Sequence, residues 1–190
     1  MHSDVATVID ELDSHRTRFE AFCRSLGSSE LEQPVPSSQW LVRDFIAHLA
    51  TIDEPVRRFF SSIRVEKKGN FDTPDGQRFN VDRWNESMVQ ARREDSIEDI
   101  LAEAAVLRAA IKDEMAQLTQ EDLDLSFTFG GDSKRPAGQV NFGQYLRGWC
   151  KHDPMHAVDM LRGIPERMTP DLESWFDDPV IRGYQKAMNP

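Results

Sequence analysis

Hydrophobic residues recur along most of this chain at intervals of three and four positions, the period that places them on one face of an α-helix. The pattern predicts long amphipathic helices, with one shorter helix near the middle of the chain. The predicted helices span residues 3–26, 38–63, 80–91, 96–118 and 142–161. A short apolar run at residues 125–129 favours a β-strand instead. The chain is therefore predicted to be mainly helical.

Capping residues mark several of the predicted helix boundaries. Ser3, Asn80 and Ser96 precede apolar runs, and each side chain can accept a hydrogen bond from a backbone N–H group of the first turn. Gly27 and Gly163 follow the ends of the first and last long helices, where glycine is favoured because it adopts the left-handed conformation readily. These residues support the boundaries that the apolar spacing predicts.

Prolines fall inside two of the predicted helices. Pro55 should bend the second helix, because proline lacks the N–H group of the helical hydrogen bond and its ring crowds the preceding turn. Pro154 should either kink the last long helix or make it start again near Asp153. Either outcome would adjust the direction of nearby side chains.

The last segment of the chain carries two further helix starts. Pro170 and Pro179 each follow a residue that can cap a helix, Thr169 and Asp178, and proline is favoured at the first helical position. We therefore predict two short helices packed on the outside of the main body.

The predicted elements indicate an all-α fold, an antiparallel four-helix bundle with short extra C-terminal helices. The helix at residues 80–91 either completes the four-helix core or lies beside it as an accessory segment. Residues 1–165 should form the bundle, and residues 166–190 should form a C-terminal helical tail packed on it.

The composition is that of a globular protein with an acidic surface. Of the 190 residues, 39% are hydrophobic and 29% charged, and the formal net charge is −10. Because this charge repels phosphate and anionic lipid, neither nucleic acid nor a membrane is an expected partner. No apolar run approaches the ~20 residues that span a bilayer, and no signal-peptide core is present, so we expect a cytoplasmic protein. Cys23 and Cys150 lack a metal-binding spacing and should be small buried residues.

Three histidines are candidates for a metal site. His152 and His156 are four residues apart in a predicted helix, so both imidazoles project from one face. His48 interrupts the apolar face of the second helix and should point inward, where a polar group needs a partner. A metal ion shared by the three would satisfy them and would keep a coordination position open for water or substrate. His2 and His15 are expected at the surface.

Each of these features also has an ordinary structural interpretation. An inward histidine such as His48 is commonly a core residue hydrogen-bonded to a carbonyl group, and a pair such as His152 and His156 can arise by chance on a helix exposed to solvent. The metal interpretation depends on both features occurring in one chain.

Two motifs resemble those of a known family. Residues 40–49, with the sequence Trp-Leu-Val-Arg-Asp-Phe-Ile-Ala-His-Leu, resemble the second-helix signature of the DinB/YfiT-like metalloprotein superfamily. They are especially similar to the N-terminal domain of mycothiol-dependent maleylpyruvate isomerases. Residues 151–157 resemble the last-helix motif of the superfamily, in which three residues separate two ligands. The resemblance extends over roughly residues 3–163, and it implies a metal-binding helical bundle.

The resemblance implies that His48, His152 and His156 are the ligands of a divalent ion, most often zinc or nickel in this superfamily. Relatives use low-molecular-weight thiols as cofactors in S-transfer or isomerisation. Maleylpyruvate isomerases continue into a second domain that contributes to the active site, whereas this sequence ends at Pro190, which argues against isomerase activity of that kind.

Three further residues are candidates for the surroundings of the site. Asp44 lies one turn before His48 and either orients that imidazole or holds a water, or else is a solvated or helix-capping carboxylate. Asp159 lies on the face of His156 and is either a hydrogen-bond acceptor or extra ligand of the site, or part of a surface ion pair. Tyr145 either lines the pocket or is an ordinary core aromatic residue.

The histidines predict a divalent-metal-binding protein, and the family resemblance implies that it acts as a thiol-dependent S-transferase on electrophilic small molecules. A metal-dependent hydrolase of a reactive small molecule and a non-catalytic stress protein that binds a metal or a ligand are the alternatives. A homodimer is also expected, because many relatives pair through bundle helices.

Overall fold

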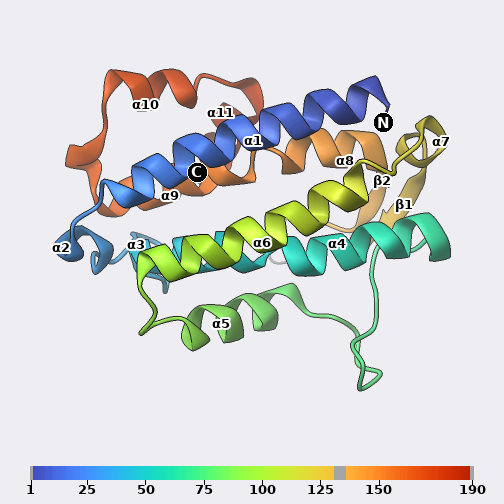
Figure 1. Cartoon of the computed structure of the whole chain (residues 1–190), viewed down its shortest axis with the longest axis horizontal. Helices are drawn as coiled ribbons and strands as arrows, with labels where there is room; N and C mark the ends of the chain where they lie inside the picture. The colour runs from blue at the N-terminus through green and yellow to red at the C-terminus, as the bar shows by residue number, and fades with distance from the viewer. Residues whose placement is uncertain (1, 131–135, 189–190) are drawn as a thin grey trace.

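The computed structural model describes residues 2–130 and 136–188 and consists mainly of α-helices (Figure 1), which confirms the predicted fold class. The helical elements are α1 (Ser3–Arg24), α2 (Ser28–Leu31), α3 (Val42–Thr51), α4 (Asp53–Ser61), η1 (Ser62–Glu66), α5 (Val81–Ala91), α6 (Ile97–Met115), α7 (Gln120–Leu123), α8 (Phe142–Trp149), α9 (His152–Gly163), η2 (Pro165–Arg167), α10 (Pro170–Trp175) and α11 (Pro179–Met188). Two strands, β1 (Ser126–Phe129) and β2 (Gly138–Asn141), form an antiparallel hairpin. Part of the sequence between them, residues 131–135, lies outside the described residues.

The bundle is built from four helical segments, which we call its layers (Figure 1). They are α1, α3 followed by α4, α6, and α8 followed by α9. Helices α1 and α6 are neighbours and run in opposite directions, as two ion pairs show. Asp13 pairs with Lys112, and Arg24, further along α1, pairs with Glu98, nearer the start of α6. The antiparallel packing expected from the sequence is therefore present between these layers.

The layer of α3 and α4 runs in the same direction as its neighbour α6. Asp53 pairs with Arg108, and further along both segments Arg64 pairs with Glu114. This arrangement is possible because α5 returns the chain to the opposite end of the bundle before α6 begins (Figure 1). α5 buries only Val89 among its residues and packs on α3. The helix predicted at residues 80–91 is therefore the accessory segment and not a member of the four-helix core.

Proline positions explain why two layers each consist of two helices. The ring of a helical proline crowds the carbonyl group four residues earlier. Pro55 lies four residues after Thr51, where α3 ends, and Pro154 lies four residues after Cys150, just past the end of α8. The second predicted helix is interrupted at Ile52, close to Pro55, and the last long helix starts again at His152.

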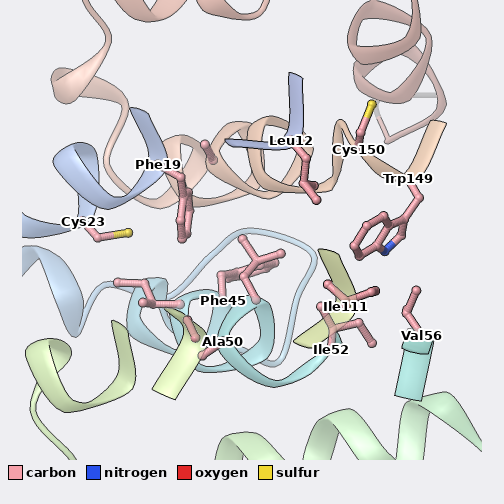
Figure 2. Close-up of a cluster of buried hydrophobic side chains, with 14 of the residues drawn as sticks. Leu12, Phe19, Cys23, Phe45, Ala50, Ile52, Val56, Ile111, Trp149 and Cys150 are labelled. Carbon is pink, nitrogen blue, oxygen red and sulfur yellow. The ribbon is translucent and has the colours of Figure 1, made fainter. Parts of the chain in front are cut away.

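The bundle core contains large apolar side chains from every layer (Figure 2). Phe19 of α1, Ile111 of α6 and Phe60 of α4 are fully buried. Cys23 and Cys150 are also buried and form no disulfide, as predicted. Burial raises the pKa of the Cys150 thiol to about 12, so this side chain stays neutral. The cysteines therefore act as apolar packing residues.

The strand predicted at residues 125–129 is present as β1, and its partner β2 was not predicted. Phe127 of β1 is buried against the end of the bundle. The linker before α5 crosses this hairpin so closely that a Cβ atom on Gly69 would lie 2.3 Å from the carbonyl oxygen of Thr128. Only glycine fits at that position without a shift of the backbone.

Most of the residues predicted to cap helix starts do so in the structure. The side chains of Asn80, Ser96 and Thr169 accept hydrogen bonds from the first turns of α5, α6 and α10. Asp178 does the same for α11, accepting from the backbone N–H of Val180 at 2.7 Å.

The first helix differs from the prediction at both ends. His2, not Ser3, caps α1. α1 ends at Arg24, and Gly27 caps the short helix α2.

The C-terminal segment packs on the bundle, with α11 against α9 and with Trp175 and Ile181 buried. The division into a bundle of residues 1–165 and a tail of residues 166–190 stays a prediction. Across the described residues, we find no helix that combines the length and apolar character needed to cross a membrane.

Candidate metal centre

The structure brings His48, His152 and His156 together where α3 faces α9. Each offers a ring nitrogen, and these three atoms lie within 4.8 Å of one another. His48 and His156 are buried, whereas His152 is partly exposed. The three histidines that the sequence singled out therefore lie together, and the cluster is accessible from the side of His152.

The start of α9 sets the geometry of the histidine pair. His152 is the first residue of α9, immediately after the break that Pro154 imposes, and His156 follows one turn later. Their Nε2 atoms lie 3.0 Å apart. The ring of His48 meets both of them nearly edge-on, with centroid distances of 5.3 Å to His152 and 4.9 Å to His156.

Aromatic rings surround the buried side of the cluster. Trp40 packs on His48 with ring centroids 5.2 Å apart, and Phe45 lies 5.5 Å from His156. The Trp40 indole N–H donates to Glu86 of α5 at 3.2 Å, so the accessory helix holds this ring in place. The cluster is therefore lined by apolar rings on this side.

Asp159 selects the tautomer of the neutral His156 ring. Its Oδ2 atom accepts hydrogen bonds from His156 Nδ1 at 2.9 Å and from the Tyr184 hydroxyl at 2.6 Å. Because a carboxylate can only accept, the proton of the neutral His156 ring lies on Nδ1, and Nε2 presents a lone pair toward the cluster. Of the interpretations that the sequence left open for Asp159, the structure shows the hydrogen-bond acceptor of His156, and Tyr184 is a partner that the sequence did not reveal.

Beneath the histidines, buried charged residues connect all four layers of the bundle. Arg16 of α1 donates to Asp153 of α9 at 2.9 Å and to the carbonyl oxygen of Leu49 of α3 at 3.2 Å. Arg108 of α6 donates to Asp53 of α4 at 2.5 Å and to Asp153 at 3.5 Å. Leu49 and Asp153 directly follow His48 and His152, so this network holds the two ligand-bearing helices in register.

The sequence did not predict this network, although arginines at inward-facing helical positions are a sign of it. Arg16 lies between the buried residues Leu12 and Phe19, at the spacing of the apolar face of α1. Arg108 holds the corresponding position on α6. Burial acts to lower the pKa of Arg108, but Asp153 and Asp53 outweigh this effect and raise it. A charged residue at an inward helical position predicts a buried partner, which sequence alone does not identify.

Asp44 caps the start of α3, which was one of the two roles considered for it. Its carboxylate accepts a hydrogen bond from the backbone N–H of Leu41 at 2.9 Å, at the start of α3. Burial raises the pKa of Asp44, while this hydrogen bond and the nearby Arg93 act in the opposite direction.

Tyr145 lies among aromatic residues of the core. Its ring centroid is 5.2 Å from that of Phe59 and 5.9 Å from that of Phe127. These contacts match the core interpretation of Tyr145.

His15 was predicted at the surface, and this prediction is wrong. The His15 side chain is only 14% exposed, because α10 of the tail covers it. The Trp175 indole N–H donates to His15 Nδ1 at 2.9 Å, and Glu11 lies 3.4 Å from His15 Nε2. Burial lowers the pKa of His15, partly against the effect of Glu11. The sequence could not show this, because the contact depends on where the tail packs.

The donor set of the cluster suits a divalent ion such as zinc. Two nitrogen ligands of a tetrahedral zinc ion lie about 3.3 Å apart, given Zn–N distances of about 2.0–2.1 Å. The 3.0 Å between the Nε2 atoms of His152 and His156 is close to this separation. The hydrogen bond from His156 Nδ1 to Asp159 is the arrangement that orients a histidine ligand and raises its basicity. The residues therefore fit a metal ion.

Comparisons with known proteins agree with the fold. A family model described as the DinB superfamily matches residues 11–160. Among solved structures, the chain is similar to YfiT from Bacillus subtilis, with 15% sequence identity, 87% of each chain covered and a TM-score of 0.62. That protein is described as a probable metal-dependent hydrolase with an unusual four-helix bundle topology. A search of curated proteins found no match.

Proposed function

The chain belongs to the DinB superfamily, and from this premise we propose that it is a divalent-metal-dependent enzyme acting on small molecules. His48, His152 and His156 are its metal ligands in this proposal. The observation that carries it is the convergence of three imidazole nitrogens from two helices within 4.8 Å. Three protein ligands are typical of catalytic zinc sites, which keep the fourth position for water or substrate. Zinc and nickel are the proposed ions.

The chain's own residues would prepare the site in three ways. Asp159 keeps the proton of His156 on Nδ1, so that Nε2 stays available as a ligand. Trp40 and Phe45 shield the buried side of the cluster. His152, which is partly exposed, lies on the side from which a substrate approaches. When bound, a divalent ion supplies a Lewis acid that polarises a substrate oxygen or lowers the pKa of water or a thiol.

Hydrolysis is the first candidate reaction. It is supported by the similarity to YfiT, which is described as a probable metal-dependent hydrolase. S-transfer from a low-molecular-weight thiol to an electrophile is the second candidate. It is supported by the motif of residues 40–49, which resembles that of mycothiol-dependent enzymes.

Metal analysis of untagged protein tests the proposed site. We expect one divalent ion per chain after reconstitution and dialysis, and we expect His152→Ala to lose it. His2→Ala is the matched control, because His2 caps α1 and is not among the three clustered histidines. Equal metal content in wild type and His152→Ala would contradict the proposal.

Turnover assays distinguish the two reactions. The metal-loaded protein is tested with chromogenic esters and lactones without thiol, and with chlorodinitrobenzene in the presence of glutathione, mycothiol or bacillithiol. Thiol-independent turnover lost in His152→Ala supports hydrolysis, and thiol-dependent turnover lost in the same variant supports S-transfer. Stoichiometric metal without turnover in either panel would contradict the enzymatic role and favour a non-catalytic binding protein.

A further inference from the structure

A tyrosine from the C-terminal tail reaches the candidate metal centre. Tyr184 lies on α11, which packs on α9, and its hydroxyl donates to Asp159 at 2.6 Å. The planes of the Tyr184 and His156 rings are nearly perpendicular, with centroids 6.4 Å apart. The DinB family model matches residues 11–160, so Tyr184 comes from a part of the chain beyond that match.

The direction of these hydrogen bonds defines a chain of three groups. Burial, and secondly the neighbouring Asp159, raise the pKa of Tyr184, so the phenol keeps its proton and donates it. Asp159 is 3% exposed, and its Oδ2 atom receives both the phenol O–H and the Nδ1–H of His156. A single carboxylate oxygen therefore holds two donors, one from α11 and one from its own helix.

The phenol restricts the carboxylate that orients the ligand. The other oxygen of Asp159, Oδ1, is buried and has no hydrogen-bond partner among the described residues. The carboxylate orientation therefore depends on the two hydrogen bonds to Oδ2. Without the Tyr184 hydroxyl, only His156 would hold Asp159, and the carboxylate would rotate more freely about its side-chain bonds. The ring of His156 would lose part of its fixed orientation toward His152 and His48.

We propose that Tyr184 is a positioning residue of the metal site, acting through Asp159 on His156, so that the C-terminal tail completes the site that the bundle begins. This inference rests on the proposed metal-binding function. It assigns to α11 a role in ligand orientation beyond covering apolar surface. Partners that orient metal-bound histidines commonly contribute about 10- to 100-fold to metal affinity.

Metal titration of paired tyrosine variants tests this role. Apo protein is titrated with Zn²⁺ against a chromophoric chelator, for wild type, Tyr184→Phe and Tyr145→Phe. Because Tyr184 acts one step away from the ligand, we expect roughly tenfold weaker binding in Tyr184→Phe, the lower end of the range for such partners. Tyr145→Phe is the matched control, since Tyr145 is the other tyrosine of the chain and packs among core aromatic residues. It should bind like wild type.

A double-mutant cycle separates positioning from general loss of stability. If Tyr184 acts through Asp159, then Tyr184→Phe will weaken Zn²⁺ binding in the wild type but not in an Asp159→Ala background. NMR of the apo protein gives a second readout, the ¹⁵N shifts of His156, which should show mixed tautomers in Tyr184→Phe. Wild-type affinity in Tyr184→Phe, or equal losses in both backgrounds, would overturn the inference while the metal site itself stands. Failure of wild-type protein to bind Zn²⁺ would overturn the proposed function and this inference with it.

Discussion

The three candidate ligands differ in their burial and in the contacts that surround their rings. His156 is fixed at Nδ1 by Asp159, and its ring contacts Phe45. His48 is buried under Trp40. His152 is partly exposed at the first position of α9.

Substitution of Asp44 tests whether its carboxylate caps α3 or orients His48. Replacing it with alanine removes the acceptor for the Leu41 N–H, which should lower the free energy of unfolding by about 1 kcal/mol. Asp44→Asn should cost less, because its amide oxygen can still accept that hydrogen bond. Urea unfolding of apo protein measures both. Zn²⁺ affinity should be unchanged in Asp44→Asn, and a tenfold loss there would instead support a role in orienting His48.

At the residue scale, the sequence predicted what depends on spacing within one helix. The pairing of His152 with His156 follows from the helical period, and the inward direction of His48 follows from the apolar face around it. Tyr184 and the true surroundings of His15 could not be predicted. Both depend on where α10 and α11 pack on the bundle, and helical periodicity does not specify which surfaces meet.

At the scale of elements, helix breaks and crossovers decide which residues meet. Pro154 divides the last long layer so that His152 begins a new helix, and the sequence predicted this restart as one of two outcomes. The parallel course of α4 and α6 was not predicted, because apolar spacing carries no information about direction. It results from α5, which returns the chain before α6 begins (Figure 1).

The contact between α1 and α10 should be sensitive to pH. The pKa of His15 is lowered in the folded protein, mainly by burial, from the ordinary value of 6.5. The folded state therefore binds fewer protons than the unfolded state at pH values below about 6.5, so stability from this site is present above that pH and is lost as pH falls toward the folded pKa. Protonation of Nδ1 would also remove the acceptor for the Trp175 N–H.

His15→Gln isolates this effect, because glutamine can accept from Trp175 but does not titrate. Urea unfolding of wild type and His15→Gln at about pH 7.5 and about pH 5 measures it, these values lying on either side of the ordinary histidine pKa. We expect the wild type to lose more stability between the two pH values than the variant. Lys151 and Glu11 near His15 are common to both proteins, so their titration largely cancels in the comparison. Equal losses would contradict the prediction.

At the scale of the whole molecule, the buried charges of four helices set the relative positions of the layers. Arg16, Asp53, Arg108 and Asp153 are each at most 6% exposed. Their positions link α1, α4, α6 and α9 immediately beneath the candidate site. The sequence predicted the bundle but not this network, because an apolar pattern gives the face of a helix and not its partner across the core.

Removing one partner of this network should be costly. Arg108→Met leaves Asp53 buried without its cation, and we expect a loss of about 3–5 kcal/mol in the free energy of unfolding. The double variant Arg108→Met with Asp53→Leu should lose less than the single variant, because the uncompensated charge is removed. Urea unfolding of both apo proteins measures this. A double variant less stable than the single one would contradict the account.

A more exposed ion pair provides the control for that experiment. Arg64 pairs with Glu114 and is 25% exposed, so Arg64→Met should cost no more than about 1 kcal/mol. The contrast between the two arginines tests whether the interior network, and not charge in general, holds the bundle together.

The proposed function requires His48, His152 and His156 to form one divalent-metal site. The most direct measurement is a crystal structure of the zinc-loaded, untagged protein, with anomalous diffraction collected at the zinc absorption edge. We predict one anomalous peak with a ring nitrogen of each of the three histidines at about 2.0–2.1 Å. A peak bound elsewhere, or none at the three histidines, would contradict the account.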